Sequence, residues 1–147
     1  MYEIESKQVL PYFLGDWKVQ REISGFGDIV GQAKFTLNSG SEQRLEYREA
    51  MVLPNSVDQK PNAFREYEYR ITDMGFDIFF ADGATKGELF LSFAFTHAST
   101  LTSYHLCIKD HYDAKFEFLS ETEFELSFSV VGPHKDYAIR TRFIKVN

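Results

Sequence analysis

The sequence predicts an all-β protein, an antiparallel up-and-down barrel of about ten short strands with a short N-terminal helix. Three observations lead to this prediction. Apolar and polar residues alternate with a period of two along most of the chain after Gly15, which is typical of half-buried strands. The connections between these runs are short, which favours antiparallel neighbours, and they hold most of the Gly and Pro. Closing such a meander into a barrel removes its exposed edges, and a two-layer sandwich is the alternative.

The helical pattern lies in residues 4–14, where Pro11 limits the length of any helix. Apolar residues recur there at roughly helical spacing, namely Val9, Leu10, Phe13 and Leu14. We expect one or two helical turns that plug the structure formed by the rest of the chain.

The strands follow in order from the alternation and from the turns that interrupt it. In the first of them, Trp17, Val19, Arg21 and Ile23 share one face, and the later runs repeat this pattern. The predicted strands cover residues 16–24, 31–38, 43–53, 63–72, 75–80, 88–96, 101–109, 114–119, 123–131 and 136–146.

Length and composition predict one globular domain over residues 1–147. Hydrophobic residues are 44% of the chain and charged residues 26%, as in ordinary folded proteins, whereas aromatic residues reach 16%. The net charge of −6 argues against a nucleic-acid partner, because phosphate binding needs a basic surface. The single Cys excludes an internal disulfide and any multi-cysteine metal site.

Several further expectations concern location and partners. No apolar run approaches the roughly 20 residues of a membrane span, so we expect no membrane partner. The N-terminal residues lack the basic region and long apolar segment of a signal peptide. We therefore expect a cytoplasmic protein, and the sequence leaves open whether it is a monomer or a homodimer.

The run Leu14-Gly15-Asp16-Trp17 resembles the Gly-x-Trp signature of the calycin superfamily, which includes lipocalins, fatty-acid-binding proteins and nitrobindin-like barrels. The resemblance implies that Trp17 seals one end of the barrel and that an Arg of the last strand covers it. Arg140 is the expected cover, with Arg142 as the alternative, because a guanidinium over an indole is worth on the order of 1 kcal/mol. Residues 24–31 leave no room for the helix pair of fatty-acid-binding proteins.

A closer resemblance covers residues 14–143. Its most specific parts are a His-x-Cys-x-x-Asp-x-Tyr stretch that begins at His105 and a Gly-Pro-x-Lys-Asp-Tyr stretch that begins at Gly132. These runs resemble the uncharacterised bacterial and fungal DUF6314 family, which implies a lipocalin-like barrel. Where the resemblance implies a Phe-His pair, this chain has Glu88-Leu89-Phe90-Leu91. The resemblance to this family implies no particular activity.

A barrel of this size can enclose one small ligand, so polar residues on the inward faces are the candidate site. The predicted ligand-binding residues are Arg21, Tyr47, Glu49, Arg65, Tyr67, Tyr69, His105 and Cys107. Buried charges are costly unless they are paired or bind a ligand. We therefore expect a Phe- and Tyr-lined cavity with a polar end, which takes a small hydrophobic or amphipathic ligand. An Arg there would hold a small organic acid or another oxygenated hydrophobic molecule.

Each of these residues has a plainer interpretation. Arg21 and Arg65 could each form an internal salt bridge with Glu49, and Arg140 could serve only as the cover of Trp17. Cys107 fits an inert core position as well as a nucleophile. The residues around Asp110, Tyr112 and 135–137 are predicted to lie in turns, where they would form a polar rim.

Three other functions remain open. An enzyme, an isomerase, cyclase or hydrolase, would use His105 as its acid or base. A nitrobindin-type barrel would ligate haem through His105, although no cofactor is predicted, and the His spacing indicates no zinc or other metal site. An interaction module would have a filled barrel and no cavity.

Overall fold

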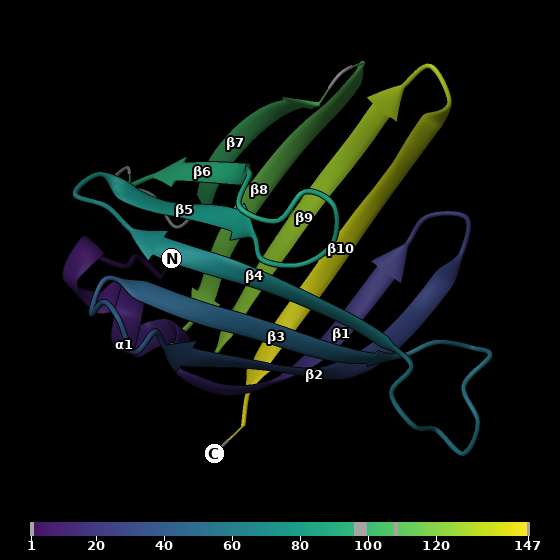
Figure 1. The fold of residues 1–147 in the computed structure, drawn as a ribbon, viewed down its shortest axis with the longest axis horizontal. Helices are drawn as coiled ribbons and strands as arrows, with labels where there is room; N and C mark the ends of the chain where they lie inside the picture. The colour runs from purple at the N-terminus through teal and green to yellow at the C-terminus, as the bar shows by residue number, and fades with distance from the viewer. Residues whose placement is uncertain (1, 96–99, 108, 147) are drawn as a thin grey trace.

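The computed structural model describes residues 2–95, 100–107 and 109–146, without the side chains of residues 6 and 104–107 (Figure 1). In this part of the chain a short helical segment precedes ten strands. The elements are η1 (Ser6–Gln8), α1 (Val9–Phe13), β1 (Gly15–Ile23), β2 (Gly27–Leu37), β3 (Arg44–Val52), β4 (Ala63–Ile71), β5 (Gly75–Phe80), β6 (Leu89–Ala94), β7 (Thr100–Cys107), β8 (Asp110–Ser120), β9 (Glu123–Gly132) and β10 (Lys135–Lys145). None of the helices described is long and apolar enough to cross a membrane.

The strands form one antiparallel sheet in the order β6-β5-β4-β3-β2-β1-β10-β9-β8-β7. Neighbours in sequence are neighbours in the sheet, and β1 pairs with β10 to bring the two ends of the chain together. At the seam between the edge strands, the backbone N–H of Ser92 on β6 donates to the hydroxyl of Ser103 on β7 (3.1 Å). The result is a nearly closed barrel, which confirms the predicted fold class.

Strand ends differ from the prediction where the sequence is polar. The first turn is only three residues long, because β2 begins at Gly27 and Ile23 pairs with that glycine. Gly25 and Gly27 adopt positive φ values of 76° and 123°, which glycine tolerates without steric cost. Strand β8 likewise begins earlier than expected, so that residue 112 lies within a strand and not in a turn, and β10 begins at Lys135, one residue before the predicted start.

Helix α1 closes the end of the barrel at which β1 begins (Figure 1). The ring of Phe13 is fully buried and packs against aromatic rings from several strands, with centroid distances of 5.0 Å to Phe35, 5.3 Å to Phe124 and 5.6 Å to Phe76. The indole N–H of Trp17 donates to the carbonyl of Phe13 (2.8 Å) and ties the helix to β1. The helical segment is therefore the plug that the sequence predicted.

The residue that covers Trp17 is Lys145, and the expectation for Arg140 is wrong. The Lys145 ammonium lies 5.0 Å from the centroid of the indole and donates to the carbonyl of Tyr12 (2.8 Å), and burial lowers the pKa of this amine. Side chains alternate along a strand, so on β10 the odd-numbered positions face inward. Arg140 faces outward, where its guanidinium bonds Glu22 (2.6 Å).

The fully buried phenylalanines are packed in the half of the barrel next to α1. Among the largest fully buried side chains there are Phe13, Phe35, Phe76, Phe93, Phe116, Phe118 and Phe124. Aromatic rings of this kind bury a large apolar area and pack with defined edge-to-face and offset geometries. This half is therefore filled, and open space is left at the opposite end.

Replacing Phe13 by Ala should lower the free energy of unfolding by about 3–5 kcal/mol, because it leaves a cavity at the centre of the plug. Denaturant unfolding followed by circular dichroism measures the loss. Phe64→Ala is the matched control: that ring is 66% exposed. It should change the free energy by no more than about 0.5 kcal/mol. Equal effects of the two substitutions would contradict the role of Phe13.

Candidate functional site

The half of the barrel away from α1 encloses a cavity of about 380 Å³. This volume falls within the range of small-molecule sites. The cavity is lined by Arg21, Ile23, Tyr47, Glu49, Arg65, Tyr67, Tyr69, Ile78, Phe80, Phe90, Tyr112, Leu126, Phe128, Tyr137, Ile139, Thr141 and Phe143. It contradicts the interaction-module hypothesis, which required a filled barrel.

The cavity has two unlike walls. The polar side chains come from β1, β3, β4 and β10, and they include Arg21, Glu49 and Thr141. Strands β5, β6 and β9 supply apolar side chains such as Phe80, Phe90, Leu126 and Phe128. The polar groups therefore spread along one wall, whereas the sequence analysis expected them at one end.

Arg21 and Glu49 form a two-pronged salt bridge inside the barrel. The Nη1 and Nη2 atoms of Arg21 each donate to one carboxylate oxygen of Glu49 at 2.8 Å. The Nε atom of Arg21 donates to the Thr141 hydroxyl (2.9 Å), and the Tyr47 hydroxyl donates to Glu49 (2.7 Å). These bonds satisfy the two charges, as a buried pair requires. Internal pairing, which the sequence left open for Arg21, is what the structure shows.

Small residues on β2 make room for this pair. Strand β2 lies between β1 and β3; Ile29 is opposite Arg21, Ala33 is opposite Glu49, and Gly31 is the inward position between them. A Cβ atom at Gly31 would lie 2.3 Å from the carbonyl oxygen of Ala50, so no larger residue fits there without movement. The long side chains of Arg21 and Glu49 therefore meet across β2 with little between them.

The environment holds both members of the pair in their charged forms. Burial alone would raise the pKa of Glu49, but the hydrogen bonds and charge of Arg21 hold that pKa below its usual value. Burial likewise opposes the charge of Arg21, yet Glu49 raises the pKa of the guanidinium. The pKa of Tyr47 is raised well above its usual value by burial and by the Glu49 charge, so this hydroxyl stays protonated.

Arg65 lies at the edge of the cavity and is paired much more weakly than Arg21. Its side chain is half exposed, and its closest ion-pair contact in the described part of the chain is Asp82, at 4.0 Å. Its Nη2 atom donates a long hydrogen bond to the Tyr67 hydroxyl (3.3 Å). The structure shows no salt bridge between Arg65 and Glu49 among the described residues. Arg65 is thus a cation with donors to spare beside the cavity.

Two tyrosine hydroxyls add to the donors of this wall. The Tyr69 side chain lines the cavity and is 2% exposed, and its hydroxyl makes no hydrogen bond to another described residue. Burial raises the pKa of Tyr69 and, despite the opposing charge of Arg65, that of Tyr67. Both hydroxyls are therefore protonated near neutral pH. Together with Arg65 they offer hydrogen-bond donors to an acceptor oxygen in the cavity.

Most of the predicted ligand-binding residues line this one cavity. They are Arg21, Tyr47, Glu49, Arg65, Tyr67 and Tyr69. His105 and Cys107 lie on β7, where the register pairs them with Tyr112 and Asp110, but their side chains lie outside the described part of the structure. Their binding and catalytic roles, and haem ligation by His105, stay predictions. In the described part of the chain no group of three His, Cys, Asp or Glu residues is placed to hold a metal ion.

Sequence reasoning missed several residues that line the cavity. Tyr112 was assigned to a turn, yet it shares its phase with inward residues further along β8. Tyr137 lies within the predicted strand 136–146 but was counted with the polar rim. The contact of Thr141 with Arg21 depends on the pairing of β1 with β10. Extending the period-two pattern toward the start of β8 would have found Tyr112.

Comparison with known proteins agrees with this fold. The model of the family described as "Family of unknown function (DUF6314)" matches residues 13–145. The chain belongs to the DUF6314 family. This confirms the resemblance on which the sequence analysis relied. None of the curated proteins matches the chain in sequence at a significant level.

Solved structures similar to this DUF6314 protein are also barrels. The S-type phycobiliprotein lyase CPES from Guillardia theta superposes with a TM-score of 0.64 at 7% identity, covering 98% of this chain and 94% of the lyase. Rv2717c from M. tuberculosis gives a TM-score of 0.58 at 11% identity, covering 99% of this chain and 100% of Rv2717c. EF1p2_mFAP2b bound to DFHBI gives a TM-score of 0.51 at 10% identity, covering 97% of this chain and 100% of that barrel. At such identities the likeness shows the fold alone.

Replacing Glu49 by Leu should lower the free energy of unfolding by about 3–5 kcal/mol, because it leaves the Arg21 charge buried without its partner. The double variant Arg21→Met with Glu49→Leu removes both charges and should recover much of this loss. Urea unfolding of the two variants and the wild type measures the difference. A single variant as stable as the wild type would contradict the salt bridge.

The same pair predicts a pH dependence. The pKa of Glu49 is lower in the folded protein than its ordinary value of 4.5, so its carboxylate stabilises the fold above that value. This stabilisation is lost as the pH falls through the lowered pKa. The advantage of the wild type over Glu49→Gln in free energy of unfolding should therefore be constant near neutrality and shrink below pH 4.5. An advantage that grows on acidification would show the opposite sign.

Proposed function

We propose that this protein is a cytoplasmic small-molecule-binding barrel whose ligand is a small organic acid or another oxygenated hydrophobic molecule. The observation that carries the proposal is the division of the cavity. Donor groups of Arg65, Tyr67 and Tyr69 gather on one wall, and Phe80, Phe90 and Phe128 form the other. A ligand with an apolar body and an acceptor oxygen satisfies both walls.

The charges on the polar wall favour an acid. Arg21 is neutralised by two short bonds to Glu49, so it adds little net charge to the cavity. Arg65 is the cavity arginine without such a partner among the described residues, and it lies where the cavity meets solvent. A carboxylate bound there would receive charge-assisted hydrogen bonds, which are stronger than neutral ones.

The apolar wall favours a flat body. The rings of Tyr67 and Phe90 are stacked with their centroids 5.8 Å apart and an interplanar angle of 16°. Phe80 and Phe128 lie 4.7 Å and 6.0 Å from Phe90, again between ring centroids. An aromatic ligand extends this cluster with the offset or edge contacts that aromatic rings prefer.

Similar barrels support ligand binding in general. EF1p2_mFAP2b is bound to DFHBI, and the barrel from Guillardia theta is a phycobiliprotein lyase. Both share the fold and little sequence with this chain. Support for an acid therefore comes from the side chains of this cavity and not from those proteins.

Thermal unfolding in the presence of aromatic carboxylates, each matched with its primary alcohol, tests the proposal. Carboxylates that bind the folded state should raise the melting temperature more than the matched alcohols. In calorimetric titrations, Arg65→Gln should weaken the affinity about tenfold or more, and Tyr69→Phe about fivefold. Arg48→Gln is the control, because Arg48 lies on the outer face, 71% exposed, and should leave the affinity unchanged.

Two results would contradict the proposal. If the alcohols bind as tightly as the acids, Arg65 does not select an anion. If Arg65→Gln and Tyr69→Phe both leave the affinity intact, the ligand binds elsewhere.

A further inference from the structure

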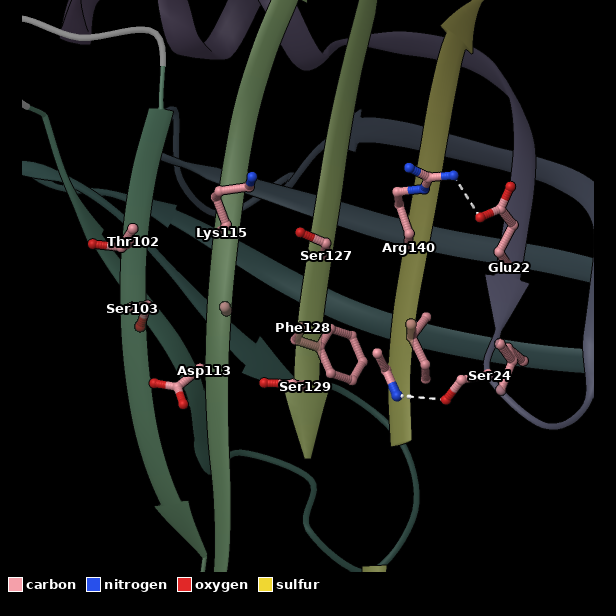
Figure 2. Close-up of a pocket in the computed structure, with 14 residues that line it drawn as sticks. Glu22, Ser24, Thr102, Ser103, Asp113, Lys115, Ser127, Phe128, Ser129 and Arg140 are labelled. Carbon is pink, nitrogen blue, oxygen red and sulfur yellow. Dashed lines mark hydrogen bonds and ion pairs between the residues drawn. The ribbon is translucent and has the colours of Figure 1, made fainter. Parts of the chain in front are cut away.

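The outer face of the barrel carries a shallow groove that the ligand proposal does not use. Its volume is about 630 Å³, and it crosses β7, β8, β9, β10 and β1 (Figure 2). Small side chains line its centre, namely Ser24, Ser127, Ser129 and Ala138. Longer charged side chains flank them, with Asp113 and Lys115 on β8 and with Arg140 and Glu22 on the other side.

The strand register arranges these side chains in two rows. Lys115 is opposite Ser127, which is opposite Arg140. Two residues further along each strand, Asp113 is opposite Ser129, which is opposite Ala138. Figure 2 shows Lys115, Ser127 and Arg140 side by side, with Asp113 and Ser129 in the neighbouring row.

Charges in the two rows have opposite signs on β8. Lys115 and Asp113 make no ion pair with another described residue, whereas Arg140 is bonded to Glu22 (2.6 Å). On β10, one step further out, Arg142 lies on the Lys115 side, where it is bonded to Glu125 (2.9 Å), and Asp136 lies on the Asp113 side. The charges of β8, which are unpaired among the described residues, are therefore antisymmetric along the strand.

An antisymmetric pattern is complementary to itself after a two-fold rotation. A two-fold axis that runs across the strands, between the two rows, places Lys115 of one copy opposite Asp113 of the other. It also places Asp113 of the first copy opposite Lys115 of the second. The same axis sets Ser127 against Ser129 of the second copy, and Arg142 against its Asp136. A two-fold interface repeats every such contact, so each favourable pair occurs twice.

We propose that this outer face is the interface of a two-fold symmetric homodimer, in which the sheets pack face to face. Face-to-face sheets lie about 10 Å apart with interdigitating side chains, and the serines and Ala138 leave room at the centre for side chains of the second copy. Opposite charges at the edge fix the register of the two copies and exclude the parallel orientation, in which Lys115 would meet Lys115.

The size of the face predicts a reversible dimer. Strands about 4.8 Å apart and outward residues about 6.6 Å apart give a patch of roughly 20 by 20 Å. Standard interfaces bury about 800 Å² per partner, about twice the area of this patch. We expect the dimer to dissociate on dilution.

Sedimentation velocity over a wide concentration range tests the proposal, with folding of each variant checked by circular dichroism. The wild type should shift from monomer to dimer as its concentration rises. Lys115→Asp and Asp113→Lys should each raise the dissociation constant by about tenfold or more, because like charges then face each other twice. The double variant, which carries both substitutions, restores opposite charges and should dimerise nearly as well as the wild type.

Lys34→Glu is the matched control, because Lys34 is an exposed lysine on the outer face of β2, and it should leave the dissociation constant unchanged. A wild type that stays monomeric at every concentration overturns the proposal. A dimer that resists both single substitutions overturns it too. So does a dimer lost in Phe64→Glu and kept in Lys115→Asp, because its interface would then be the outer face of β2, β3 and β4.

Discussion

The buried salt bridge between Arg21 and Glu49 is the interaction on which the open half of the barrel depends. Two unit charges inside a protein are costly unless every hydrogen-bonding site is satisfied, and here Thr141 and Tyr47 complete the set. This requirement brings polar groups from β1, β3 and β10 to one wall. The barrel is packed near α1, and the cavity lies at the opposite end.

The division of the aromatic residues follows from that constraint. Phenylalanine fills the end that α1 closes, around Phe13 and Trp17, where the indole N–H and the Tyr12 hydroxyl bond to backbone carbonyls. Tyrosine concentrates around the cavity, because its ring packs like that of phenylalanine while its hydroxyl reaches a polar neighbour or open space. Tyr47, Tyr67 and Tyr69 show this along two adjacent strands. The many aromatic residues thus pack the end of the barrel next to α1 and line the cavity at the other end.

The period-two alternation was enough to predict the strands, the barrel and the inward phase of Arg21, Glu49 and Tyr69, because that phase is a local property of a strand. Which arginine is paired could not be predicted, because pairing depends on neighbours across the sheet. Arg140 illustrates the same limit, because its place beside Trp17 was inferred from resemblance. The odd-numbered residues of β10 face inward, and Lys145 is the one that lies over Trp17. Tyr112 escaped notice because polar residues at strand ends resemble turns.

A ligand in this cavity should place its oxygen on the Arg65 wall and its body on the Phe90 wall. A crystal structure of the protein grown with an aromatic carboxylate tests this most directly. We expect electron density in the cavity, with carboxylate oxygens within hydrogen-bond distance of Arg65 and of the Tyr67 or Tyr69 hydroxyl, and with Arg21 still bonded to Glu49. A ligand in the reverse orientation, or a cavity filled by side chains with Arg21 turned to solvent, would contradict it.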